Sequence, residues 1–159
     1  MMDNNSFQKF VLFLIFTVLT VGISLIYIEL HSRNSIERSR FSQEIMTYFL
    51  DNKRFNTIAN DIYDGKPILK ENKGTWDESD IDDYLGYYEK LDDYVDAGSL
   101  NLRDEFDDFS DEILDAYHNK EIKNYIKATR DSAHDNSYYE HFERLAKSFD
   151  EMNKELKNK

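Results

Sequence analysis

Hydrophobic and polar positions divide the chain into one continuous apolar run and, after it, a series of helical stripes. The run extends from Phe10 to Ile28, nineteen residues without a charge. As a helix it would measure about 28 Å, close to the thickness of a bilayer hydrocarbon core. The segment YIELH, which ends at His31, lacks the small residues of a signal-peptide cleavage site. The pattern therefore predicts an uncleaved transmembrane anchor within residues 1–31.

Basic residues are found on both sides of this run. Lys9 lies before it, and Arg33, Arg38 and Arg40 lie after it. Because positive residues near a span favour the cytoplasmic side, the three arginines predict that the C-terminal part of the chain is cytoplasmic. The same arginines are the candidate membrane-interface residues, where they would contact the anionic head groups of the lipid bilayer. We expect a single-pass protein of the cell membrane with a cytoplasmic domain.

Apolar residues after the anchor recur at intervals of three and four, which is typical of helices that bury one face. A first helix is predicted from Ile36 to Ile62, followed by a polar connection that ends at Gly74. Thr75 and Glu78 have the spacing of a capping box, so a second helix is predicted to begin there and to continue toward Gly98.

Further helices follow with short connections. Asn101 and Asn119 are predicted N-caps, and a polar break near Asp135 precedes a last helix. Because short connections make consecutive helices pack side by side, the predicted fold class is all-α, with an N-terminal transmembrane helix followed by an antiparallel bundle of four or five helices. Residues 32–74 would form a juxtamembrane helix and polar connection, and residues 75–159 the acidic cytoplasmic domain. Helical phase predicts a core that contains Tyr88, Leu91, Phe106, Phe109, Phe142 and Phe149.

Composition favours a core of aromatic side chains. The chain has 159 residues with no Cys, so neither a disulfide nor a thiolate metal site stabilises it. It contains 11 Tyr and 11 Phe, which are enough to build a core. A single Pro and five Gly favour long uninterrupted helices over the turns of a sandwich or barrel.

Acidic residues are concentrated in one part of the chain. Between Trp76 and Ala116, sixteen Asp and Glu accompany only Lys90 and Arg103, whereas the whole chain has a formal charge of −12. This acidic belt repels phosphate backbones, which argues against nucleic acid as a partner. Two interpretations stay open. The belt is either a solvated face that keeps the domain soluble or a surface for a basic protein partner.

Motifs for metals, cofactors and catalysis are missing from the sequence. The acidic clusters at 77–83 and 104–108 do not have the spacing of a calcium loop. The four His form no ligand pair with helical spacing. Phosphate-binding loops and nucleophile motifs are also missing. The sequence therefore predicts neither a metal nor another cofactor.

Arg130 and His134 are the candidate catalytic pair. If the helix that begins at Asn119 continues to His134, both side chains lie on one face. A guanidinium there would hold a phosphate, and an imidazole would move a proton. The alternative is a surface arginine with a histidine near a helix end, where the protonated ring interacts favourably with the helix dipole. Neither residue is predicted to be catalytic on spacing alone.

Residues 83–135 resemble a group of short prokaryotic proteins with one N-terminal membrane helix and a small helical domain. The elements that carry the resemblance are the helix with Tyr88 and Glu89, Gly98 before a polar turn, and the aromatic, acidic helix that follows. Within this group the chain is most similar to the membrane-anchored accessory protein of type VI-B RNA-targeting CRISPR systems. That family has an N-terminal span and a divergent HEPN-like helical domain.

The resemblance implies a homo-oligomer that acts in antiviral defence and is activated by an RNA-guided effector. HEPN ribonucleases carry more residues between their Arg and His than the three found between Arg130 and His134, which argues against a nuclease. Our first hypothesis is a membrane-anchored, oligomeric accessory or effector protein of prokaryotic antiviral defence that perturbs the membrane. The alternative is a membrane-tethered helical interaction or scaffold module without catalytic activity. An HEPN-like RNase is the only enzymatic candidate.

Overall fold

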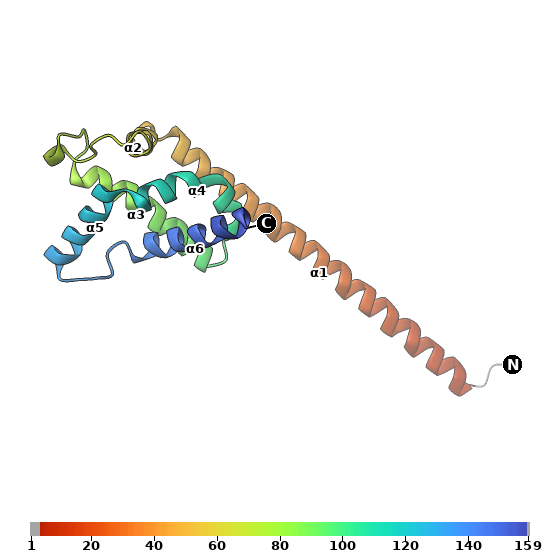
Figure 1. Cartoon of the computed structure of the whole chain (residues 1–159). Coiled ribbons are helices and arrows are strands. Elements are labelled where there is room, and N and C mark those ends of the chain that lie inside the picture. The colour runs from red at the N-terminus through yellow and green to blue at the C-terminus, as the bar shows by residue number, and fades with distance from the viewer. Residues whose placement is uncertain (1–3, 159) are drawn as a thin grey trace. The chain divides into compact units, whose positions relative to one another are not determined.

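Helices make up most of the part of the chain that its structure describes (Figure 1). The computed structural model describes the backbone of residues 4–158, and the side chains of these residues except 4–12, 14, 15, 18 and 31. The described residues contain an isolated β-bridge between Leu69 and Trp76 but no strand. The predicted all-α class is therefore confirmed. The elements are α1 (Asn4–Asp51), α2 (Lys53–Tyr63), the 3-10 helix η1 (Lys70–Asn72), α3 (Glu78–Asp96), α4 (Leu102–His118), α5 (Lys120–Ala133) and α6 (Glu140–Lys157).

Two compact units make up the chain, residues 1–40 and residues 41–159. Helix α1 begins in the first unit and ends in the second. The second unit begins earlier than the predicted domain boundary at residue 75, because Phe41, Ile45 and Phe49 at the end of α1 pack against its core.

The first unit consists of α1 up to Arg40. Within the described part of the chain, no helix is long and apolar enough to cross a membrane. The predicted span, residues 10–28, lies partly outside that part, since the side chains of residues 10–12, 14, 15 and 18 are not described.

Aromatic rings from four helices form the core of the second unit. Phe49 of α1 lies 5.6 Å from Phe109 of α4 and 6.0 Å from Tyr88 of α3, measured between ring centroids. Tyr88 also lies 6.1 Å from Phe142 of α6. All six core residues predicted from helical phase are buried, which confirms the phase of α3, α4 and α6.

The closest helix packing joins elements that are distant in sequence. Helix α6 packs against α3 and α4, and α2 packs against α4. Among consecutive helices, α4 and α5 pack closely. The expectation that sequence neighbours lie side by side therefore holds for α4 and α5. Helix α3, in contrast, makes its most extensive contacts with α6. Aromatic side chains on the inner face of α6 explain why α6 packs against α3 and α4, because Phe142 contacts Tyr88 of α3 and Phe149 contacts Phe106 of α4.

Capping residues mark the helix ends described next, and two of these ends differ from those predicted from the sequence. The single helix predicted from Ile36 to Ile62 is interrupted at Asn52, whose side chain accepts from the backbone of Phe55 and caps α2. The capping box of α3 is formed by Asp77 and Asp80, not by Thr75 and Glu78. The predicted caps on α4 and α5 are confirmed. The Oδ1 atom of Asn101 accepts from Arg103 at 2.9 Å, and that of Asn119 accepts from Glu121 at 2.8 Å.

The connection between α2 and α3 is less polar than its sequence indicates. Ile68 and Leu69 are buried, and Trp76 donates its backbone N–H to Ile68 at 2.9 Å. Gly74 is required by this close approach, because a Cβ atom there would lie 2.3 Å from the Ile68 backbone. The segment is therefore a packed loop that closes one end of the core.

Candidate functional site

The α3 part of the acidic belt is tied to α6 by ion pairs. Arg144 of α6 donates from Nε to Asp92 at 2.9 Å and from Nη2 to Asp96 at 2.5 Å. Asp92 is only 4% exposed, so its charge requires such a partner. One turn earlier on α6, the Nδ1 atom of His141 lies 2.6 Å from Asp93. These carboxylates hold the two helices together.

The first turns of α3 are held in the same way. Arg54 of α2 lies 2.9 Å from Asp80 and 2.7 Å from Asp83. Asp82 accepts hydrogen bonds from the hydroxyls of Tyr125 and Tyr139. Burial, reinforced by the bond to Asp82, raises the pKa of Tyr125 to about 12, so the phenol stays protonated and donates. On α3, most of the acids are therefore paired, although Asp82, Asp83, Asp93 and Asp96 also stay exposed to solvent.

Helix α4 carries acids of the belt that form no ion pairs within the described residues. Asp104, Asp107, Asp108 and Asp111 are exposed, and none of them takes part in an ion pair within the described part of the chain. Their spacing of three and four residues places them on the outer side of a helix whose inner side carries Phe106 and other apolar residues.

Glu121 fixes the loop between α2 and α3. Its carboxylate accepts from the backbone N–H groups of Ile68 at 2.9 Å and Leu69 at 2.7 Å, and from the amide of Asn72 at 2.9 Å. Burial opposes ionisation of Glu121, but the hydrogen bonds from Asn72, Ile68 and Leu69 outweigh it and lower the pKa. This acid is structural.

Glu105 is a buried acid with incomplete hydrogen bonding. Ser42 of α1 donates to its Oε1 atom at 2.9 Å, whereas its Oε2 atom has no partner. Burial, with smaller contributions from the nearby carboxylates of Asp108 and Asp104, raises the pKa of Glu105 to about 7. The sequence prediction missed this residue, although its position three after Leu102 and four before Phe109 places it on the inner face of α4.

The candidate catalytic pair does not share a helix face. Helix α5 ends at Ala133, and His134 adopts the left-handed conformation with φ 54°. The Arg130 side chain donates from Nε to the carbonyl of Tyr138 at 2.9 Å and lies 3.3 Å from Glu143. His134 is exposed, and its Nδ1 atom lies 3.2 Å from the carbonyl of Ser132. Arg130 therefore binds the α5–α6 loop and α6, and His134 caps the end of α5.

The predicted membrane-interface arginines all belong to the first unit. Arg33 lies 2.7 Å from Glu29, one helical turn earlier on α1. Arg38 and Arg40 are exposed on the same helix. These side chains are thus free to face solvent or lipid head groups.

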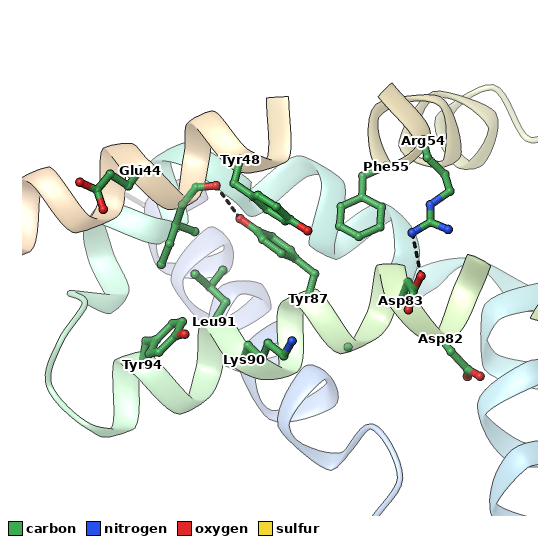
Figure 2. A pocket seen from close by; sticks show the side chains of 12 residues that line it. Glu44, Tyr48, Arg54, Phe55, Asp82, Asp83, Tyr87, Lys90, Leu91 and Tyr94 are labelled. Atoms are coloured by element: carbon green, nitrogen blue, oxygen red, sulfur yellow. Dashed lines mark hydrogen bonds and ion pairs between the residues drawn. The ribbon is translucent and has the colours of Figure 1, made fainter. Parts of the chain in front are cut away.

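A groove in the second unit lies between the end of α1 and α3, and α2 closes one end. Figure 2 shows Glu44 and Tyr48 on α1 and, across from them, Lys90 and Tyr94 on α3. The groove has a volume of about 470 Å³, within the range of ligand and peptide sites. Its walls are joined where the hydroxyl of Tyr87 donates to the carbonyl of Ile45 at 3.0 Å. We call this feature the α1–α3 groove.

The side chains of the α1–α3 groove are suited to binding, not to proton transfer. Burial, followed by the charge of Glu105, raises the pKa of Tyr87, so its phenol is a hydrogen-bond donor and not a base. Across the described residues, no three acidic or histidine side chains are arranged to hold a metal ion. The groove could not be predicted from the sequence, because its two walls come from segments about forty residues apart, as the Tyr87–Ile45 bond illustrates.

Fold and site together define a small all-α protein with an aromatic core, an internally paired acidic helix and an open groove between α1 and α3. The chain belongs to the DUF4760 family, a domain of unknown function whose model matches residues 14–149. No curated protein and no solved structure matches the chain.

Proposed function

We propose that the chain is a membrane-tethered helical interaction module, in which residues 10–28 form the anchor and residues 41–159 the domain that binds a partner at the cytoplasmic face. One observation carries the proposal. Ten large apolar side chains between Phe13 and Leu30 are each more than half exposed. Apolar exposure on this scale is typical of surfaces that contact a membrane or another protein.

The distribution of these side chains favours a membrane. Leu25, Ile26, Tyr27 and Ile28 are consecutive and exposed, and four consecutive positions point to every side of a helix. A helix that docks on a protein surface has one apolar stripe, whereas a helix surrounded by lipid is apolar all round. Residues 10–28 also contain no charge.

The hydroxyl groups in this segment are satisfied within the helix. Thr17 donates to the carbonyl of Phe13 at 2.9 Å, Thr20 to that of Phe16 at 2.8 Å, and Ser24 to that of Thr20 at 2.8 Å. Hydrogen bonds of this type let hydroxyl side chains enter a hydrocarbon environment, where no water is available as a partner.

The anchor is tested by placing charge in its middle. The double variant Leu19→Arg, Ile23→Arg is expected to lose membrane retention, because each arginine near the centre of a span costs about 2.5–3.5 kcal/mol. Membranes that contain the wild-type chain should keep it after a carbonate wash, whereas the double variant should be released. Tyr63→Arg, which alters an exposed residue of the second unit, is the matched control and should stay in the membrane. Release of the wild type would refute the anchor.

Orientation is tested separately with a reporter fused after Lys159. Arg33, Arg38 and Arg40 predict cytoplasmic activity of the reporter. Activity on the opposite side would contradict that argument without affecting the anchor.

The more specific role in antiviral defence stays a prediction from the resemblance. In that role, the same anchor and the same domain would belong to an oligomer that perturbs the membrane. The genes beside the one for this chain test it, since neighbouring RNA-guided defence genes favour that role and ordinary envelope genes favour a general tether.

A further inference from the structure

We propose that the α1–α3 groove is the docking site for a second copy of this chain, with Glu44 of each copy pairing with Lys90 of the other across a two-fold axis. The inference rests on the proposed function, because it names the partner of the same interaction module. All residues of this interface belong to the second unit, residues 41–159.

The charges at the edges of the groove indicate what kind of occupant fits. Glu44 and Lys90 are exposed, and neither forms an ion pair within the described residues. Arg54 and Asp83, which also line the groove, are already paired with each other at 2.7 Å. Asp82 lines the groove as well, but its carboxylate accepts hydrogen bonds from the hydroxyls of Tyr125 and Tyr139. Glu44 on α1 and Lys90 on α3 are therefore the acid and the base of the groove that have neither an ion pair nor a side-chain hydrogen bond among the described residues.

An occupant must satisfy both charges. An anionic ligand beside Lys90 would also meet Glu44, and a cationic ligand would meet Lys90. A purely apolar ligand would cover both charges without pairing them, which is costly. A second copy presents the same acid and base, and a two-fold axis brings each acid to the other copy's base. The surface is thus complementary to itself.

Two exposed tyrosines supply the apolar part of the interface. Tyr48 is 61% exposed and Tyr94 is 39% exposed, although both line the groove. Tyr48 stacks on Tyr87 with ring centroids 6.1 Å apart, and Tyr94 meets Phe41 edge to face at 5.0 Å. These ring contacts fix both tyrosines before binding, so little side-chain entropy is lost on association. Tyrosines held in this way are frequent anchors of protein interfaces.

The first test exchanges the charges of Glu44 and Lys90 in the full-length chain. Self-association in detergent micelles is measured by analytical ultracentrifugation. Glu44→Lys and Lys90→Glu should each weaken dimerisation about tenfold or more, because each places like charges together. The double variant restores both pairs with exchanged signs and keeps the net charge. Its dimerisation should therefore return to the wild-type level.

Matched controls separate this pairing from the general charge of the chain. Arg103→Glu and Glu71→Lys make the same charge changes at exposed positions that form no ion pair within the described residues. They should leave dimerisation within about twofold of the wild type. Equal losses in the controls, or failure of the double exchange to restore dimerisation, would overturn the proposal.

Cross-linking gives a second readout that does not depend on the anchor. The chain has no cysteine, so single cysteines introduced at Glu44 and Lys90 are unique. A mixture of Glu44→Cys and Lys90→Cys chains should give a mixed dimer with a short bismaleimide, and a mixture of Glu71→Cys and Arg103→Cys chains should not. A groove that holds lipid, detergent or another ligand would give no mixed dimer above that control, which would refute the inference. A chain retained in carbonate-washed membranes without this cross-link would leave the anchor intact and refute only the dimer.

Discussion

Replacing Glu105 by Gln tests whether a buried carboxyl between α1 and α4 makes the fold sensitive to pH. The Glu105 side chain is fully buried, and its Oε2 atom has no hydrogen-bond partner. Gln has nearly the same shape, and its amide oxygen can still accept from the hydroxyl of Ser42. The substitution therefore removes the ionisation while keeping the packing and the one hydrogen bond.

The expected effect follows from the pKa of Glu105. Burial raises this pKa from its ordinary value of 4.5 to about 7. Between these two values the folded protein keeps a proton that the unfolded chain has released, so the free energy of unfolding falls as the pH rises. At about 1.4 kcal/mol for each pH unit, the loss is about 3 kcal/mol and is complete above pH 7. Gln does not titrate, so Glu105→Gln should gain about that amount relative to the wild type at pH 8.

The assay is urea unfolding of both proteins in detergent micelles between pH 4.5 and pH 8. All other titrating groups are shared, so they cancel when the two free energies of unfolding are subtracted. Asp107→Asn, at an exposed position of the same helix, is the control and should show little change with pH. A difference between Glu105→Gln and the wild type that stays constant over this range would refute the reasoning. A wild type that becomes relatively more stable at high pH would refute it as well.

Two further predictions concern the core and the α5–α6 loop. Phe109→Ala and Phe142→Ala should each lower the free energy of unfolding by about 3–5 kcal/mol, because both rings are fully buried. Urea unfolding measures this loss. Losses below about 1 kcal/mol would show that the predicted helical phase is wrong. Arg130→Gln should lower the free energy of unfolding by about 1.5–3 kcal/mol, because the hydrogen bond to the carbonyl of Tyr138 is lost. His134→Asn should change this free energy by less than about 0.5 kcal/mol, because Asn tolerates the left-handed backbone at this position. Equal losses for these two variants would contradict their separate roles.

Helical phase could be predicted because it depends on each helix alone. The spacing of Tyr84, Tyr88 and Leu91 identifies the buried side of α3 whatever that side packs against, and all three are buried. The partners of each helix could not be predicted in the same way. The ion pair between Arg144 and Asp92 joins residues 52 positions apart, and nothing in either local sequence indicates the other.

The start of α3 shows how a tertiary contact decides between two local signals. The predicted capping box was Thr75 with Glu78, whereas the box that forms is Asp77 with Asp80, which has the same spacing two residues later. The bridge between Leu69 and Trp76 keeps residue 76 extended, since Trp76 donates to Ile68 and its carbonyl accepts from Lys70 at 2.9 Å. A helix that began at Thr75 would break this bridge. The helix therefore begins at the capping box of Asp77 and Asp80.

Whether Arg130 and His134 share a helix face also depended on where a helix ends. Spacing by four residues brings two side chains together only if the helix continues through both, and α5 ends one residue before His134. The loop after α5 contains two non-glycine residues in the left-handed conformation, His134 and Tyr139. Arg130 stabilises this loop, which explains why the arginine turns toward Tyr138 and Glu143 and not toward His134.

The uneven use of the acidic belt bears on how two copies of the chain can meet. Helix α3 is partly compensated, because Arg54 and Arg144 pair with four of its carboxylates. Helix α4 is not, and its four exposed aspartates repel any surface of the same kind. Repulsion between copies is therefore weakest where α3 is exposed. The α1–α3 groove lies there, so the proposed dimer of a chain of net charge −12 would use a surface on which several carboxylates already have partners.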